Sequence, residues 1–227
     1  MNKLKHRFVF IFVGTILLFL VNLVAGSNSF NKVSLQRVDD VLSKMSLSQK
    51  IGQFLMVSLY DVPKSDQLHY FDTGFVGSAI LFKDAKKIEQ ILTIRKIFNE
   101  AAPKTTHQLP IFMAIDHEGG GLGRSGTVFP RMIVLGVLNN DRLTKRVGKV
   151  IAKEVKRLGI NIVFAPVCDV NTVSKNPIIG ARSFSQDPEI VSQHCLAFAK
   201  AMISEGIIPV AKHFPGHGTT WEDSHLV

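Results

Sequence analysis

Beyond residue 33 the chain alternates between apolar runs and segments with the periodicity of an amphipathic helix. The apolar runs cover residues 53–59, 76–82, 111–116, 160–167 and 207–214, and the helical patterns cover residues 34–50, 84–100, 141–158 and 187–205. Near-continuous apolar strands are expected in a sheet covered on both faces, and their alternation with helices is typical of parallel βα units. The sequence therefore predicts an α/β fold built on a parallel sheet.

Residues suited to helix ends stand at the boundaries of these patterns. Asp84, Asp141 and Asp187 are candidates for the N-cap position, where a carboxylate accepts hydrogen bonds from the first backbone N–H groups. Gly159 and Gly206 follow two of the helical patterns, and glycine is favoured just after a helix because it adopts the left-handed conformation. These signals support the helical ranges given above.

Polar residues end or follow four of the five apolar runs. They are Lys83 and Asp84, then Asp116, His117 and Glu118, then Asp169 and Asn171, and finally Lys212 and His213. The carboxyl ends of parallel strands face one crevice, both in an open doubly wound sheet and in a barrel. We therefore expect these side chains to converge. No glycine-rich nucleotide fingerprint follows the first strand, and an eight-stranded barrel would need about three further βα units.

The first 26 residues have the pattern of an export signal. A basic start with Lys3, Lys5 and Arg7 precedes an apolar run over residues 8–26, and small residues near Ser27 suit cleavage. The run is also long enough to span a bilayer, so an uncleaved N-terminal anchor is the alternative. We expect an exported protein, which is either periplasmic, secreted or held at the membrane by this segment alone.

The net charge of +9 does not by itself indicate a nucleic-acid partner. Three of the positive charges lie in the leader, and seven basic residues lie within the helical pattern over residues 141–158, where they suit a solvated outer face. No nucleic-acid-binding motif accompanies them. Two cysteines, Cys168 and Cys195, are too few for a disulfide framework, so we expect them to be small buried hydrophobic residues.

Two loops carry candidate ligands for a polar substrate. In AIDHEGGGLGR, Asp116 and Arg124 flank a glycine-rich turn and could bind the hydroxyl groups of a sugar, or form an ion pair that shapes the loop. In GARSFSQDP, Arg182 could bind hydroxyl or acyl oxygens, or fix a long surface loop.

The C-terminal stretch KHFPGHGTTWEDSH is the densest polar segment. Lys212 and His213 stand at a strand end, where the backbone can turn and present both side chains. Asp223 and His225 share a face of an extended segment, so the carboxylate can orient the imidazole and leave one ring nitrogen for general acid/base catalysis. Zinc binding by His213, His217, Asp223 and His225 is an alternative, although the spacing matches no common zinc motif.

Together AIDHEGG, ARSFSQDP and KHFPGHGTTWEDSH resemble glycoside hydrolase family 3, in its bacterial β-N-acetylglucosaminidase branch. The resemblance runs from about Leu47 to the C-terminus. It implies a TIM-like (β/α)8 barrel, of which residues 27–227 would hold about five of the eight βα units, and the removal of terminal N-acetylglucosamine with retention. It implies no cofactor and assigns sugar binding to Asp116, Arg124, Arg182, Lys212 and His213, the acid/base role to His225, and its orientation to Asp223.

The chain departs from the family pattern at three points. Gly121 stands where an arginine is usual, and Thr219 replaces a common aspartate. The family's nucleophile is an aspartate on a later strand, and no residue of this chain is assigned to that role. We therefore expect no turnover from the isolated chain. An inactive remnant or sugar-binding module is the second hypothesis, and a metal-dependent hydrolase is the third.

Overall fold

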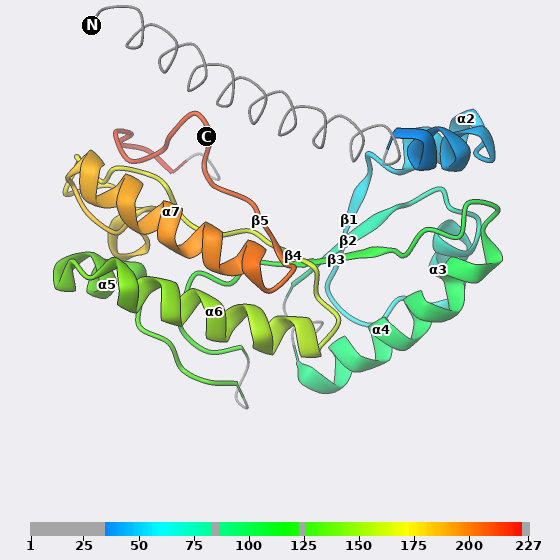
Figure 1. Ribbon diagram of the computed structural model, residues 1–227, viewed down its shortest axis with the longest axis horizontal. Coiled ribbons are helices and arrows are strands. Elements are labelled where there is room, and N and C mark those ends of the chain that lie inside the picture. The colour runs from blue at the N-terminus through cyan, green and yellow to red at the C-terminus, as the bar shows by residue number, and fades with distance from the viewer. Residues whose placement is uncertain (1–34, 83–86, 123–125, 224–227) are drawn as a thin grey trace, which may run out of the picture. The chain divides into compact units, whose positions relative to one another are not determined.

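The computed structural model describes residues 35–82, 87–122 and 126–223 (Figure 1). The chain divides into two units, residues 1–46 and residues 47–227. The described part of the first unit is a helix over residues 35–43. No helix in the described ranges is long and apolar enough to cross a membrane. The predicted leader, residues 1–26, lies outside the described residues.

The single helix predicted over residues 34–50 is wrong. The helix over residues 35–43 ends in tight turns, in which the N–H groups of Lys44 and Met45 donate to carbonyls three residues earlier. A separate helix, α2, covers Leu47–Gly52 in the second unit. Both segments have helical periodicity, so the pattern alone does not mark the break at residues 44–46.

The second unit contains a five-stranded parallel sheet with the strands in chain order. The strands are β1 (Met56–Leu59), β2 (Ser78–Leu81), β3 (Phe112–Ile115), β4 (Ile162–Val163) and β5 (Ile208–Pro209). One row of paired residues crosses the whole sheet through Leu59, Leu81, Ile115, Val163 and Pro209. A doubly wound sheet reverses its strand order at a switch point, and this sheet does not. Consecutive parallel strands are the arrangement of a barrel, of which this sheet is an open arc.

The last two strands are shorter than the sequence pattern predicts. Residues 160–167 and 207–214 were expected, whereas β4 and β5 have two residues each. Pro209 lies within β5, where Ile208 N and Val210 N on either side of it donate to Asn161 O and Val163 O. β4 ends where Ala165 N turns back to donate to Val163 O, directly before Pro166, which has no N–H group to donate. Pairing resumes beyond Pro166 as a bridge between Val167 and Lys212, where Cys168 N donates to Lys212 O over 2.7 Å. The site residues of this segment therefore lie beyond the regular sheet.

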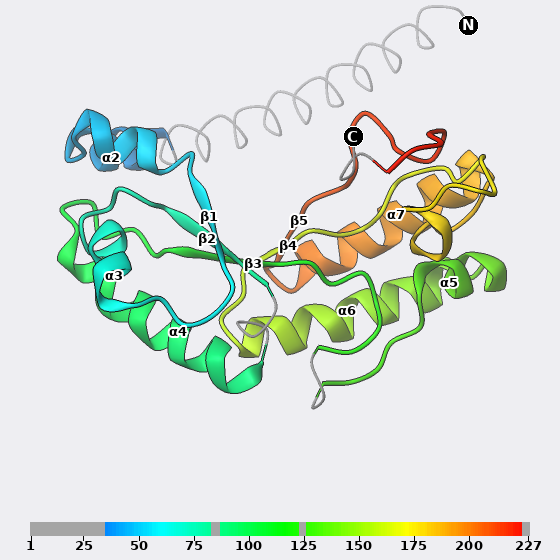
Figure 2. The ribbon, with the colours of Figure 1, turned by 180° about the vertical axis from the view of Figure 1, so that it is seen from behind.

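Five longer helices accompany the strands of this unit. They are α3 (Ser65–Asp72), α4 (Ile88–Ala101), α5 (Met132–Leu138), α6 (Asp141–Arg157) and α7 (Pro188–Ser204), with 3₁₀ turns η2 (Ala102–Lys104) and η3 (Gly180–Arg182). Helices α6 and α7 lie side by side in both views (Figures 1 and 2). Buried side chains of α4, α6 and α7 form one core with those of the strands, including Leu81, Ile94, Phe98, Ile115, Ile151, Val163 and Phe198.

The helix ends match the predicted signals in part. Asp187 caps α7 as predicted, because its carboxylate accepts from Glu189 N over 2.8 Å. Gly159 and Gly206 adopt positive φ angles of 87° and 81°, which confirms their place after α6 and α7. Asn140, rather than Asp141, caps α6 by accepting from Leu143 N. Asp141 is the first helical residue instead, where its charge favours the positive end of the helix dipole.

Candidate functional site

Polar side chains from three strands meet at the carboxyl ends of the sheet. Asp116 and Glu118 follow β3, Asp169 follows β4, and Lys212 and His213 lie beyond β5. Arg182 enters the same place from η3 and completes the group, which we call the strand-end cluster. This position is where functional groups collect in parallel α/β folds.

Lys212 lies between two carboxylates of the cluster. Its ammonium Nζ donates to Asp116 Oδ1 over 2.7 Å and also contacts Glu118 Oε1. The lysine side chain is 12% exposed, whereas that of Asp116 is 33% exposed. The Lys212 ammonium is therefore largely buried, whereas the Asp116 carboxylate keeps part of its surface exposed.

Arg182 and Glu118 form a two-point ion pair. Arg182 Nε donates to Glu118 Oε2 over 2.7 Å, and Arg182 Nη2 donates to Glu118 Oε1 over 2.8 Å. Arg182 Nη1 donates to the carbonyl of Ile178, which anchors the guanidinium to its own loop. Paired hydrogen bonds of this kind are strong and fix orientation. The sequence predicted Arg182 as a ligand, but it did not single out Glu118, the residue that holds it.

Electrostatics keep the Glu118 carboxyl ionised. Burial alone would raise its pKa, but hydrogen bonds from Arg182 and Lys212, together with their positive charges, outweigh burial and lower the pKa from 4.5 to about 2. The same hydrogen bond from Arg182 to Glu118 raises the pKa of the guanidinium. Glu118 is thus an anionic anchor for two cations rather than a proton donor.

Asp169 is a second residue that the sequence analysis did not assign to the site. It is 2% exposed, and its carboxylate accepts from the backbone N–H groups of His213 over 3.2 Å and His217 over 2.5 Å. Oδ2 also lies 2.6 Å from His213 Nδ1. A buried carboxylate needs such donors to offset its lost hydration. Asp169 therefore fixes the backbone on both sides of the Phe214–Gly216 turn.

The two neighbours of His213 define its tautomer. An ionised carboxylate can only accept, so Nδ1 carries the hydrogen shared with Asp169. A guanidinium can only donate, so Nε2 accepts from Arg182 Nη2 at 3.1 Å. His213 is therefore a neutral, oriented imidazole that positions Arg182. Lys212 and His213 are adjacent, and both side chains reach the cluster, as predicted for a strand end.

The loop after His213 is held by one amide side chain. Asn176 Nδ2 donates to the carbonyls of His217 and Thr220 over 2.7 and 3.1 Å, and its Oδ1 accepts from Ile178 N and Ile179 N. Thr220 Oγ1 lies 2.7 Å from His217 Nδ1. Asn176 thus couples the Arg182 loop to the loop that leads to Asp223. Nothing in the sequence around Asn176 indicates this role, because His217 and Thr220, the partners in the second loop, lie 41 and 44 residues away along the chain.

We expect Gly218→Ala to destabilise this loop. A Cβ at Gly218 would lie 2.0 Å from the carbonyl oxygen of Val170, which is backbone and cannot swing aside. Overpacking of this kind costs about 1–3 kcal/mol. The free energy of unfolding, measured by urea denaturation, should fall by that amount. Thr219→Ala, at the exposed neighbouring position, should change it by less than about 0.5 kcal/mol, and equal stability of the two variants would refute the contact.

Two predicted site residues lie outside the described residues. They are Arg124, predicted to bind the sugar, and His225, predicted as the acid/base, so the pairs Asp116–Arg124 and Asp223–His225 remain predictions. Asp223 is described and half-buried at the end of the loop. The described partner of Asp116 is Lys212. In the part of the chain that the structure describes, no group of three or more His, Cys, Asp or Glu side chains could hold a metal ion, and the predicted zinc set includes His225, which is outside it.

An open arc of consecutive parallel strands, with polar side chains at their carboxyl ends, is the arrangement expected of part of a (β/α)8 barrel. The model of the glycosyl hydrolase family 3 N-terminal domain matches residues 46–227. The chain therefore belongs to this family, and the resemblance drawn from the three sequence motifs is confirmed.

Three relatives illustrate the similarity. Beta-hexosaminidase A of Pseudoalteromonas piscicida is 40% identical over an alignment of 158 positions that covers 66% of this chain and 26% of that protein. The structure of a β-N-acetylglucosaminidase of this family from Paenibacillus sp. str. FPU-7 matches with a TM-score of 0.74 and 31% identity, over 80% of this chain and 35% of the other. NagZ from Neisseria gonorrhoeae, in complex with N-trifluoroacetyl-D-glucosamine, matches with a TM-score of 0.68 and 31% identity, over 76% and 53%. The chain thus spans about a quarter to a half of these proteins.

Proposed function

We propose that the strand-end cluster binds a terminal N-acetylglucosamine residue of a cell-wall or chitin-derived glycan. The observation that carries this proposal is the pairing of Asp116 with Lys212 and of Glu118 with Arg182 at one strand end. Fixed carboxylates accept from sugar hydroxyl groups, and fixed cations donate to hydroxyl and acyl oxygens. Asp116 and Arg182 each keep about a third of their side-chain surface exposed, so both can meet a ligand.

The proposed reaction is retaining hydrolysis by a β-N-acetylhexosaminidase. His225, oriented by Asp223, would protonate the leaving oxygen and later deprotonate a water molecule. A retaining glycosidase also needs a nucleophilic carboxylate about 5 Å from the acid/base group, and no residue of this chain is assigned to it. Relatives named β-hexosaminidases support the activity, and the neighbour in complex with N-trifluoroacetyl-D-glucosamine supports the sugar class.

A sugar-binding module without turnover is the second candidate. It requires the strand-end cluster but neither His225 nor a nucleophile. Hydrolysis of a chromogenic N-acetylglucosaminide by the longest native product that contains this segment separates the two candidates. Release of the chromophore supports the hydrolase. Binding of N-acetylglucosamine with no release above the rate of the buffer supports the module.

Metal-dependent hydrolysis is tested in the same assay. The hydrolase proposed above needs no metal, so a chelator should leave its rate unchanged. Loss of the rate with chelator, and its return on addition of zinc, would contradict the acid/base assignment.

We propose that the protein is exported through its N-terminal segment. The basic start and the apolar run over residues 8–26 support this proposal. N-terminal sequencing of the protein recovered from fractionated cells should show either a chain that begins near Ser27 outside the cytoplasm or an intact chain in the membrane fraction. An intact chain in the cytoplasmic fraction would contradict export.

A further inference from the structure

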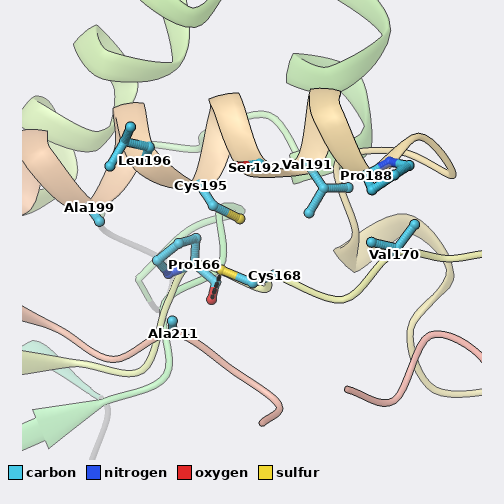
Figure 3. Close-up of a pocket in the computed structure, with 10 residues that line it drawn as sticks. All are labelled: Pro166, Cys168, Val170, Pro188, Val191, Ser192, Cys195, Leu196, Ala199 and Ala211. Atoms are coloured by element: carbon cyan, nitrogen blue, oxygen red, sulfur yellow. Dashed lines mark hydrogen bonds between the residues drawn. The ribbon is translucent and has the colours of Figure 1, made fainter. Parts of the chain in front are cut away.

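Two thiols lie together between α7 and the segment after β4, next to the strand-end cluster. Cys168 follows β4, and Cys195 lies in α7; the structure has both as free thiols. Cys195 Sγ lies 3.5 Å from the carbonyl oxygen of Val167, and Cys168 Sγ lies 3.8 Å from that of Pro166. The sulfur atoms thus contact the carbonyls of two successive residues. Figure 3 shows both side chains pointing into the space between α7 and the segment after β4.

A cavity gives access to this pair. Both cysteines line a cavity of about 420 Å³ with Pro166, Val170 and Leu196. Leu196 and Ala211 at its border are exposed, Cys168 is half-buried, and Cys195 is 7% exposed. A small molecule can therefore reach Cys168 before Cys195.

The two thiols also differ in acidity. A hydrogen bond from Cys195 lowers the pKa of the Cys168 thiol against the opposing effect of burial. The interaction with Cys168 and then burial raise the pKa of the Cys195 thiol. The thiolate is the reactive form of cysteine, so the more accessible residue is also the better nucleophile.

We propose that Cys168 and Cys195 form a redox-active dithiol that exchanges with small disulfides such as oxidised glutathione. The Cys168 thiolate attacks one sulfur atom of the external disulfide, forms a mixed disulfide and releases one glutathione thiol. Cys195 then loses its proton and attacks the Cys168 sulfur, which forms the Cys168–Cys195 disulfide and releases the second glutathione thiol. The protein loses two electrons and two protons, and the external disulfide gains both.

The disulfide would act on the site through Asp169, the neighbour of Cys168. It would link α7 to the segment that contains Asp169. The Asp169 carboxylate accepts hydrogen bonds from the backbone N–H groups of His213 and His217. A crosslink between residues 168 and 195 also restricts the unfolded chain. Oxidation should therefore raise Tm by several degrees.

The test uses the whole 227-residue chain, which contains no other cysteine. The folded protein is incubated with oxidised glutathione, quenched with iodoacetamide, and analysed by intact mass and by a peptide map without reductant. The expected product has lost two hydrogen atoms and contains peptides joined through Cys168 and Cys195. In the Cys195→Ser variant the reaction should stop at the mixed disulfide, with one glutathione on Cys168. Cys168→Ser should react much more slowly, because Cys195 is buried.

Two results would overturn the proposal. One is wild-type protein that carries glutathione on both cysteines, since this shows that the second thiol does not reach the first. The other is folded protein that resists oxidised glutathione, while the same protein in urea reacts at both cysteines. Circular dichroism of each variant before treatment verifies that the folded state is the one tested.

Discussion

Glu118→Gln is expected to lower the free energy of unfolding at pH 7 by about 3 kcal/mol. The Glu118 side chain is 17% exposed and neutralises both Arg182 and Lys212, so the substitution leaves two mostly buried cations without their shared anion. Removal of one partner from a buried ion pair typically costs 3–5 kcal/mol. Urea denaturation monitored by circular dichroism measures the change.

The pH dependence of stability gives an independent check on Glu118. Its pKa is about 2 in the folded chain, against an ordinary value of 4.5. The unfolded state therefore binds the proton more tightly, and the stabilisation is complete above pH 4.5 and is lost as the pH falls toward 2. The difference corresponds to about 3 kcal/mol. In Glu118→Gln this part of the acid dependence should be absent.

Glu100→Gln is the matched control, because Glu100 is exposed on α4, far from the cluster along the chain. It should change the free energy of unfolding by less than about 0.5 kcal/mol. If Glu118→Gln and Glu100→Gln were equally stable at pH 7 and equally sensitive to acid, the ion-pair account of the cluster would be wrong.

His225→Ala is expected to reduce turnover by about 10²- to 10⁴-fold on substrates with a poor leaving group, the usual contribution of general acid/base catalysis. The experiment uses the longest native product that contains this segment and an aryl N-acetylglucosaminide of high leaving-group pKa. Substrates with a good leaving group need no proton from the enzyme, so their cleavage should be much less affected. Steady-state kcat on both substrates measures the difference.

The residue between the acid/base pair provides the control for this experiment. The predicted acid/base pair gives no role to Ser224, so Ser224→Ala should retain most of the activity. Asp223→Asn should reduce the rate and alter its pH profile, because the orienting carboxylate is lost. An unchanged rate for His225→Ala on the poor leaving group would refute its acid/base role.

The positions of most site residues could be predicted from the strand pattern. Apolar runs locate the strands, and residues just after them lie at the carboxyl ends, which brought Asp116, Lys212 and His213 to one place. Arg182 lies on a long loop, and the resemblance to the family, rather than periodicity, assigned it to the site. In the structure Arg182 forms a bidentate ion pair with Glu118, which follows β3, and its role as a sugar ligand stays a prediction.

Glu118 and Asp169 show what the sequence pattern leaves out. Each belongs to a polar group after a strand, yet its role depends on distant donors. His213 and His217 lie 44 and 48 residues from Asp169 along the chain, and Arg182 lies 64 residues from Glu118. The end of β4 was missed for a related reason. The apolar run continues past the end of β4, although Ala165 N turns back to Val163 O there and Pro166 has no N–H group to donate to the sheet.

Binding of N-acetylglucosamine by the 227-residue chain itself tests the central claim most directly. Trp221 is the sole tryptophan, is 76% exposed and lies in the loop that leads to Asp223, so its emission can follow a titration. We expect saturable binding that weakens at least about tenfold in Lys212→Met and in Asp116→Asn, because each loses a charged hydrogen-bonding group. Lys104→Met, which breaks the remote pair with Asp72, should bind as the wild type does. Folded wild-type protein that does not bind the sugar, or Lys212→Met and Asp116→Asn variants that bind it equally well, would contradict the account.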